Sequence, residues 1–382
     1  MSPNHDLKIS PAQVAAALAV GTIAVLMVGV QPILLGELVE ARQVSLEGVG
    51  IVAMAEIIML GLGVLLGDAL LPGARLRLIT IVAALCAAGL DLLTLQATGD
   101  GAMTGVRAAA GLAEGVLVWG TTGVVVRTAN PARVGGVFFV AQTLAQALLG
   151  AVLANAIIPR WGWPGGFVAL GLLALVPCLL AFVQPARLSP LAPPAVSGFR
   201  WSATTLLPLA VVFLQLATLG SFWAYLEPLG KAAGFDARSA QTLIAAVLVM
   251  QVVGGSVAAL AVRRLPVVPT LVACSLLLAA VTTTIHQLPG GSTRDFALAC
   301  ALFGSCGCSC CRSTSAWRSV PTPAAAWPGW CRRRSCWAAP SGRSWPRSSS
   351  RATTPTRCPC SAPALRWRPP RCCCSRAAAW VR

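Results

Sequence analysis

Residues 184–203 have the sequence QPARLSPLAPPAVSGFRWSA, and they interrupt a chain that otherwise consists of long apolar runs. The prolines Pro185, Pro190, Pro193 and Pro194 predict a stiff, extended linker. A membrane-spanning helix needs about 20 mostly apolar residues. Six such runs precede the linker and three follow it. They lie near 13–35, 48–70, 76–97, 103–126, 134–158, 163–183, 205–226, 240–262 and 266–286.

The composition agrees with membrane-spanning helices. Of the 382 residues, 56% are hydrophobic and 11% are charged, and the mean hydropathy is +0.75. Soluble domains carry about 25% charged residues. These values exclude a soluble globular enzyme and a disordered or fibrous chain, and they predict an all-α, polytopic membrane protein. Six spans, a linker and a second set of spans are the layout of a transporter built from two parallel halves.

The sequence therefore divides into four parts. Residues 1–183 are the predicted N-terminal six-helix half, and 184–203 are a cytoplasmic, Pro-rich linker. Residues 204–304 start a second half with helices seven to ten. The tenth run begins at Asp295 with FALACALFG and then stops being apolar. Residues 305–382 form a tail that does not resemble a domain.

The tail accounts for the unusual totals of the chain, which has a formal net charge of +17 and 15 cysteines. Residues 305–382 hold 14 Arg, 11 Cys and 7 of the 12 Trp, and they hold no Lys, Asp or Glu. The other residues carry 15 basic and 12 acidic side chains, a net charge of +3. Their four cysteines stand singly in apolar segments, so we expect small apolar side chains rather than disulfides or metal ligands.

Several interpretations of the tail are open. A zinc site would need Cys-x-x-Cys pairs and usually His, and no His follows His286. A nucleic-acid-binding tail normally mixes Lys with Arg, and disulfides are not expected in a cytoplasm-bound segment. A shifted reading frame in a GC-rich gene fits the composition best. Residues 320–346, translated in a shifted frame, permit a loop ending in Gly-Arg and then a small-residue-rich helix, and Cys372-Cys373-Cys374 becomes Leu-rich. We expect out-of-frame translation.

Basic residues in the loops predict the orientation in the membrane. With the N-terminus inside, nine Lys and Arg before residue 305 lie in cytoplasmic segments and five lie in outer segments. The positive-inside rule then places the N-terminus in the cytoplasm. The polar start and the long apolar run after it do not form a cleavable signal peptide. We expect a multi-pass protein of the plasma membrane, the inner membrane of a bacterium.

Several motifs resemble those of the major facilitator superfamily, in particular its twelve-helix drug and sugar efflux branch. In the fourth run, Arg107-Ala-Ala-Ala-Gly111 resembles the family's R-x-x-x-G motif, whose Arg sits mid-membrane and is linked to proton coupling. Gln31-Pro32 resembles the proline that closes helix one in efflux members. The resemblance covers residues 12–304. It implies the family's bundle of two six-helix halves, with the second half incomplete here.

Two further motifs carry the resemblance. The loop between the second and third runs is similar to the family's gating motif, a Gly followed by Asp-Arg-x-Gly-Arg-Arg, although its Asp-to-Gly spacing is two residues longer. The matching residues are Gly63, Asp68, Gly73, Arg75 and Arg77. Arg160-Trp161-Gly162-Trp163 is similar to the Gly-Trp-Arg-Trp start of helix six. In the fifth run Gly150 has no following Pro, which departs from the family's antiporter motif.

Charged side chains within the spans are candidate functional groups, because charge in a lipid-spanning segment is costly. Arg107 is predicted to bind an anionic group or to control a nearby carboxyl, with a structural ion pair as the alternative. Glu114 lies two helical turns along the same face. Glu114 is predicted to carry the coupling proton, and an interfacial Glu or one hydrogen-bonded to a neighbouring helix is equally open. Glu56 is predicted to titrate as well, and a fixed pair with Arg107 is equally open. Asp91 is interpreted as structural, and Glu227 as part of an interfacial aromatic belt with a gate as the alternative.

Amide side chains in the spans are candidates for the substrate cavity, namely Gln31, Gln142, Gln146, Gln215 and Gln251. They could hydrogen-bond a polar solute or join helices to one another. The many Gly and Ala residues predict close helix packing rather than chemistry. The sequence has no Gly-rich phosphate loop with a Lys and no His cluster, so we expect no cofactor, no metal and no ATP drive.

Together these features predict a secondary transporter of the major facilitator type. It would export a small organic solute by proton-coupled antiport and alternating access. The expected partners are the solute, protons and the lipid bilayer. We expect no nucleic acid, and we expect a monomer. The alternative is a truncated, non-transporting membrane protein, either a pseudogene product or a sensor. A membrane enzyme is disfavoured because the sequence lacks a nucleophile constellation.

Overall fold

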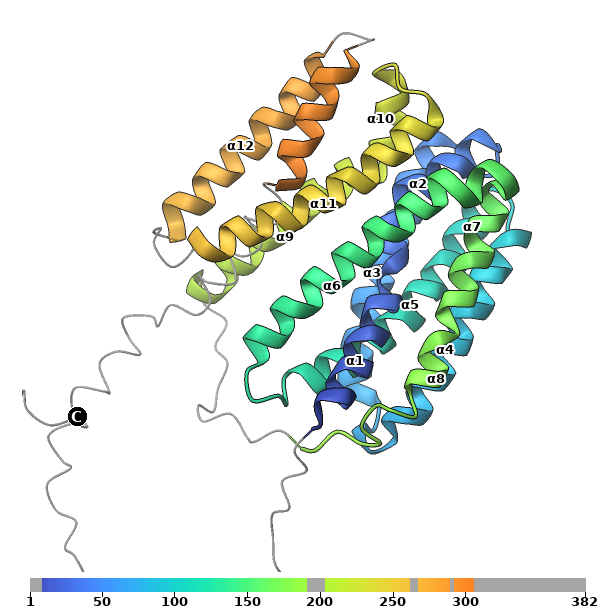
Figure 1. Ribbon diagram of the computed structural model, residues 1–382, viewed down its shortest axis with the longest axis vertical. Helices are drawn as coiled ribbons and strands as arrows, with labels where there is room; N and C mark the ends of the chain where they lie inside the picture. Colours follow the sequence, from blue (N-terminus) through green and yellow to red (C-terminus); the bar gives the residue numbers. More distant parts are fainter. Residues whose placement is uncertain (1–8, 191–202, 262–266, 289–291, 306–382) are drawn as a thin grey trace, which may run out of the picture. The chain divides into compact units, whose positions relative to one another are not determined.

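A computed structural model describes residues 9–190, 203–261, 267–288 and 292–305, and the regular elements of these residues are all helical (Figure 1). In chain order they are α1 (Pro11–Ala24), α2 (Leu26–Glu40), α3 (Leu46–Leu70), η1 (Gly73–Arg75), α4 (Leu76–Leu93), η2 (Thr94–Gln96), α5 (Asp100–Val125), α6 (Pro131–Val152), η3 (Leu153–Ile157), α7 (Ile158–Ala174), α8 (Val176–Leu180), α9 (Ala203–Ala224), α10 (Leu226–Ala232), α11 (Ala237–Ala261) and α12 (Val267–Gln287). A further helical segment covers residues 293–305. Residues 306–382 of the predicted tail, and 191–202 of the linker, lie outside the described residues.

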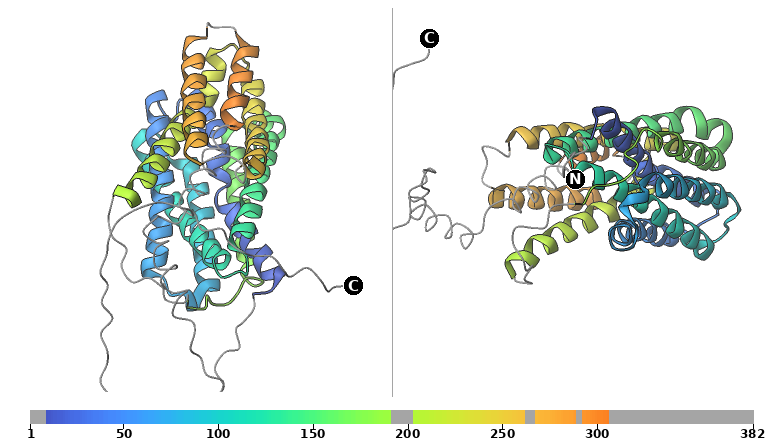
Figure 2. Two further views of the ribbon diagram at one scale, coloured as in Figure 1. Left: turned by 90° about the vertical axis from the view of Figure 1, so that its left-hand side faces the viewer. Right: turned by 90° about the horizontal axis from the view of Figure 1, so that it is seen from below.

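Six helical stretches of the described residues are long and apolar enough to cross a membrane, by length and composition. One of them, Pro131–Leu180, contains both the fifth and the sixth predicted spans. The chain turns within it at Gly162, whose φ of 59° and ψ of −163° are open essentially to glycine. The predicted spans before the linker are therefore present as α1–α2, α3, α4, α5, α6–η3 and α7–α8 (Figure 2). After it, α9–α10, α11 and α12 match the next three.

Helices α3 and α5 touch along a seam of glycines. A Cβ at Gly111 would overlap the carbonyl oxygen of Glu56, and a Cβ at Gly115 would overlap that of Leu60. From the other side, a Cβ at Gly63 would meet the α5 backbone. Small residues let the backbones of membrane helices approach closely. The packing predicted from the glycine content is confirmed at this seam, which places Glu56 directly beside α5.

The first span is interrupted twice, and at each point a side chain from another helix donates to a backbone carbonyl. Helix α1 ends at Val25, whose carbonyl oxygen accepts a hydrogen bond from Gln146 Nε2 of α6 at 2.6 Å. Pro32 inside α2 has no N–H for the carbonyl of Val28 one turn earlier. That carbonyl accepts instead from Trp223 Nε1 of α9 at 2.9 Å. Carbonyl groups in an apolar medium require such partners.

The first residues of the linker are fastened to the N-terminal half. The Leu188 N–H donates to the carbonyl oxygen of Gly73 at 2.8 Å. The Arg77 guanidinium donates from Nε and Nη2 to the carbonyl oxygen of Gln184, at 3.3 and 3.2 Å. We call residues 184–190 the linker strap. The strap holds the end of the sixth span against the turn between α3 and α4.

Candidate functional site

Four ionisable side chains from three helices meet inside the N-terminal half. Arg107 lies in α5, and its Nη2 forms an ion pair with Glu56 Oε1 of α3. Its Nη1 lies 2.6 Å from Asp91 Oδ1 of α4. Glu114 Oε1, two turns farther along α5, lies 3.5 Å from Arg107 Nη2. We call Arg107, Glu56, Asp91 and Glu114 the ion cluster.

The ion cluster is closed off from solvent. The side chains of Arg107 and Glu56 are fully buried, and those of Asp91 and Glu114 are 6% and 7% exposed. The Arg107 guanidinium carbon lies 5.6 Å from the ring centre of Phe167 on α7, which is a cation–π distance. Burying such groups costs desolvation energy that replacement by apolar side chains would avoid. Their presence within a predicted span therefore favours a functional role over a purely stabilising one.

Gln31 of α2 belongs to the same site. Its Nε2 donates to Glu56 Oε2 at 3.0 Å, and the residue is buried. Gln31 directly precedes Pro32, so the interrupted first span is hydrogen-bonded to the ion cluster. A change in the protonation or position of Glu56 can therefore alter its hydrogen bond to α2.

The ion cluster is unbalanced in charge. One guanidinium faces three carboxyl groups, which gives a formal charge of −2 if all four groups are ionised. Arg107 Nε and Glu114 Oε2 are buried and have no hydrogen-bond partner within the described ranges. Uncompensated buried charge is costly. Carboxyl groups can remove it by binding protons, so the chemistry available to the cluster is proton uptake and release.

The sequence predicts three members of the ion cluster and places the fourth differently. Glu114 shares the α5 face of Arg107, and the pairing of Glu56 with Arg107 is one of the two alternatives left open. Asp91 was predicted to be a structural residue, apart from the coupling set. Its ion pair with Arg107 is compatible with that structural interpretation, which stays a prediction. A carboxylate in a predicted span was the available signal, but the sequence did not show which way α4 turns that carboxylate.

The five residues of the predicted gating motif occupy different environments. Gly63 packs in the α3–α5 seam. Asp68, near the end of α3, and Arg75 in η1 are exposed. Gly73 and Arg77 both bond the linker strap. Two of the five residues therefore fasten the linker, and a gating role for the motif stays a prediction.

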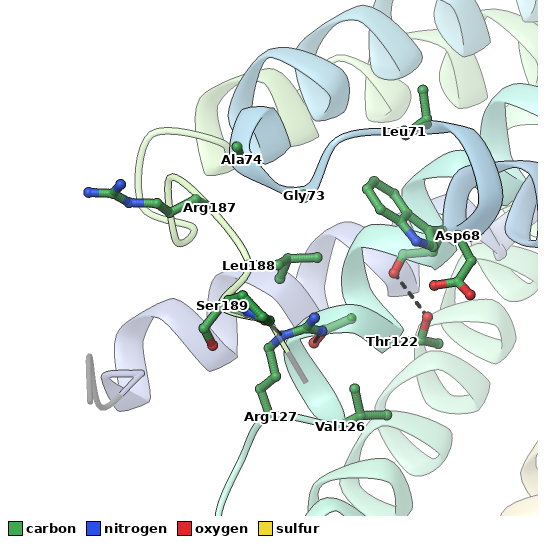
Figure 3. Close-up of a pocket in the computed structure, with 13 residues that line it drawn as sticks. Asp68, Leu71, Gly73, Ala74, Thr122, Val126, Arg127, Arg187, Leu188 and Ser189 are labelled. Atoms are coloured by element: carbon green, nitrogen blue, oxygen red, sulfur yellow. Dashed lines mark hydrogen bonds between the residues drawn. The ribbon is translucent and has the colours of Figure 1, made fainter. Parts of the chain in front are cut away.

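A pocket of about 690 Å³ lies beside the linker strap (Figure 3). Arg127 lines it and donates from Nε to the Ser189 carbonyl oxygen and from Nη1 to the Gly123 carbonyl oxygen, each at 2.6 Å. Asp68 and Arg187 line the same pocket (Figure 3). Because Arg127 is engaged with backbone carbonyls, this pocket is best explained by the docking of the strap.

The amide side chains predicted to line a substrate cavity are found in separate places. Gln146 is bonded to the carbonyl of Val25 at the end of α1. Gln215 of α9 donates to Ser275 Oγ of α12 at 2.9 Å. Gln142 and Gln251 are half-buried. Gln146 thus has a structural role at the helix break, and the cavity assignment of the others stays a prediction.

A second polar cluster joins the two halves of the chain. Lys231 Nζ of α10 lies 2.5 Å from Glu40 Oε1 of α2 and 2.7 Å from Glu227 Oε1. Gln241 Nε2 of α11 donates to Glu37 Oε1 of α2 at 2.6 Å and to Glu227 Oε1 at 3.3 Å. We call Glu37, Glu40, Glu227, Lys231 and Gln241 the latch. It binds the end of the first span to the segment that follows α9.

The burial of Glu227 corrects the sequence interpretation. The residue is 0% exposed, and its carboxylate lies so close to Gly36 of α2 that a Cβ there would overlap Oε2. Trp223, expected in the same aromatic belt, is buried and bonded to Val28. An interfacial belt does not fit this burial. The sequence did not reveal that α2 would cover these side chains.

No protein-family model matches the sequence, and the comparison with curated proteins gives no match. Solved structures do match. The nucleoside transporter NupG has a TM-score of 0.55 at 14% identity, over 82% of this chain and 84% of that chain. A bacterial homologue of the human lysosomal transporter Spinster, in an inward-facing and unoccupied conformation, has a TM-score of 0.54 at 14% identity, over 81% and 79%. A D-xylose–proton symporter has a TM-score of 0.57 at 14% identity, over 85% and 91%.

These likenesses show the fold. The chain has the same helical-bundle fold as these solved transporters, with long apolar helices suited to cross a membrane several times. The fold predicted from the linker and the spans is therefore confirmed. At 14% identity, the likeness does not transfer a substrate or a direction of transport from these proteins.

Proposed function

We propose that this protein is a secondary active transporter, not an enzyme, and that it exports a small organic solute in exchange for protons by alternating access. The buried ion cluster carries the proposal, because three carboxyl groups around one guanidinium form a site whose proton count can change. The export direction is supported by the resemblance of Gln31-Pro32 to efflux members.

In the proposed cycle, Glu114 exchanges the coupling proton. Its Oε2 has no hydrogen-bond partner in the described part of the chain, and its Oε1 is the farthest of the three carboxyl contacts from Arg107. Protonation of Glu114 weakens its attraction to Arg107 and tightens the remaining pairs with Glu56 and Asp91. Glu56 passes this change to α2 through Gln31. Proton binding at the cluster is thereby linked to the first span.

The latch supports the alternating-access part of the proposal. It bonds α2 of the N-terminal half to α10 and α11 of the second half, so separating the halves at this end must break it. On the orientation predicted from the loop charges, this end faces outward and the N-terminus lies in the cytoplasm. We place the protein in the plasma membrane of a bacterium, as a monomer that contacts solute, protons and lipid.

The competing proposal is a truncated, non-transporting membrane protein, and the composition of the tail favours it for the chain as given. Its 14 Arg, which have no acidic residue in the tail to pair with, do not suit membrane-spanning helices. We attribute residues 305–382 to translation in a shifted reading frame. A restored frame would supply the apolar helices that complete the second half.

Both proposals are tested by one comparison. The 382-residue chain and a frame-restored chain are expressed in bacterial cells, and efflux of ethidium and of glucose is measured with and without a protonophore. We expect protonophore-sensitive efflux from the frame-restored chain and background efflux from the given chain. Equal efflux from both chains would contradict the frame proposal, as would mass-spectrometric peptides from 305–382 together with an intact gene. Efflux that the protonophore does not reduce would contradict proton coupling.

Removing the ammonium group of the latch should loosen the contact between the halves. Lys231→Met leaves Glu227 buried without its cation and breaks the pair with Glu40. A hydrogen bond to a charged group contributes about 1.5–3 kcal/mol, so we expect amide hydrogen exchange in α10 to rise about tenfold or more. The control is Arg294→Met, at an exposed residue. Unchanged exchange in α10 of Lys231→Met would rule out a latch function.

A further inference from the structure

One carboxyl oxygen of the ion cluster is left without a partner. Glu114 Oε1 faces Arg107, but Glu114 Oε2 is buried and bonds no group of the described residues. The residue is only 5% exposed, so bulk water does not reach this oxygen freely. Leaving a buried carboxyl oxygen unbonded costs about 1–3 kcal/mol or more. A buried polar atom without a hydrogen-bond partner in a native structure calls for an explanation, and a bound water is a common one.

A small cavity lies beside the Glu114 side chain. Its volume is about 20 Å³, and Glu114 and Asp91 are the two charged residues that line it. The remaining walls are apolar. They come from both sides of the α1–α2 break and from α4, α5 and α7, and consist of Ile23, Ala24, Leu26, Met27, Ala87, Leu117, Leu170, Leu173 and Ala174. The cavity thus presents two carboxyl groups on an otherwise apolar surface.

The volume and the lining residues of the cavity indicate which kind of molecule it can hold. A buried water needs about 10–15 Å³ and two to four polar partners, and cavities that stay empty are lined by apolar groups alone. Organic solutes occupy pockets of about 300 Å³ or more. Within the described residues no group of three or more His, Cys, Asp or Glu side chains is arranged to hold a metal ion. One water molecule is the occupant that fits both the volume and the carboxyl groups.

We propose that this cavity is a binding site for one water molecule, which donates hydrogen bonds to Glu114 and Asp91 and joins the two carboxyl groups into one proton-sharing unit. The water site itself stands on the cavity and the unpartnered oxygen. Proton sharing rests in addition on the proposed transport function. Without the water, Glu114 and Asp91 are connected only through Arg107, which has no proton to exchange at ordinary pH.

The water site also lies beside the α1–α2 break in the first span. Ala24 and Leu26, on either side of the α1–α2 break at Val25, form part of the cavity wall. A proton that moves between Glu114 and Asp91 changes the charge next to that break. This second route to the first span is independent of the hydrogen bond between Gln31 and Glu56.

The test fills the cavity with a larger side chain. Ala87→Val adds two methyl groups to the α4 wall, while Ala88→Val adds the same volume to the adjacent, equally buried residue, which does not line the cavity. Structures of the full 382-residue chain in lipid nanodiscs are determined at a resolution that shows ordered water. We expect a water at Glu114 Oε2 in the unsubstituted chain and in Ala88→Val, and none in Ala87→Val. An empty cavity in the unsubstituted chain, or a protein group bonded to Oε2, would overturn the water site.

A second arm measures the proton-to-solute ratio in whichever chain exports ethidium or glucose. We expect Ala87→Val to lower the ratio toward uncoupled export and Ala88→Val to leave it unchanged. A water at Glu114 with an unchanged ratio in Ala87→Val would refute proton sharing and retain the water site. An ordered water without any proton-coupled export would count against the proposed function alone.

Discussion

Replacing Arg107 by Ala should abolish proton-coupled export while the protein still inserts into the membrane. The guanidinium holds Glu56, Asp91 and Glu114 together. Removing one partner of a buried ion pair costs about 3–5 kcal/mol. Because no cation then holds the three carboxyl groups together, we expect protonophore-sensitive efflux to fall to the background level in the chain that transports. Membrane-fraction abundance and elution as a single species in detergent measure insertion and folding.

Two further variants distinguish a loss of proton coupling from a loss of folded protein. Arg160→Ala removes an exposed Arg that bonds the carbonyl of Ala156 in its own helical stretch, so its efflux should match the unsubstituted chain. Arg107→Ala combined with Glu56→Gln removes a buried negative charge along with the cation. It should reverse any loss of folded protein seen in Arg107→Ala, without recovering coupling. Wild-type efflux in either Arg107 variant would exclude the coupling role. Recovery of both abundance and coupling in the double variant would show that Arg107 is only structural.

The helices were predictable because they depend on local composition. A long apolar run between polar loops has few alternatives in a membrane. Arg107, Glu56 and Glu114 were predictable as site residues for a related reason, since each is a charge in a stretch where charge is costly. These inferences need no knowledge of neighbouring helices.

Several contacts could not be specified from the sequence because they depend on how neighbouring helices are rotated. Asp91 contacts Arg107 because α4 turns it that way, and the period of α4 alone does not define that direction. Gln146 was a candidate either for the solute cavity or for joining helices, and it bonds the carbonyl of Val25 next to the end of α1. Glu227 is buried because α2 approaches it at Gly36. In each case the partner is distant in sequence, so one sequence without its packing does not reveal it.

The glycine seam is the feature on which the ion cluster depends most, and its removal should have the second large effect. In Gly111→Ala the new Cβ would overlap the carbonyl oxygen of Glu56, a backbone atom that cannot rotate away. Overpacking of this kind costs about 1–3 kcal/mol, and moving α3 away from α5 also separates Glu56 from Arg107. We expect a lower unfolding midpoint in SDS titration of the purified protein, together with loss of proton-coupled efflux. Gly111→Val should be more severe in both respects.

Gly105→Ala is the matched control, because Gly105 lies in the same helix and its Cβ would meet no atom within 4 Å. Alanine in a helix interior is favoured over glycine by about 0.5–1 kcal/mol. The two substitutions should therefore have opposite signs, with Gly105→Ala neutral or stabilising and Gly111→Ala destabilising. Helix propensity alone would make both stabilising, so equal midpoint shifts would show that the seam does not limit the approach of α3 to α5. A destabilised Gly111→Ala that keeps full coupling would show instead that the Glu56–Arg107 contact tolerates the displacement.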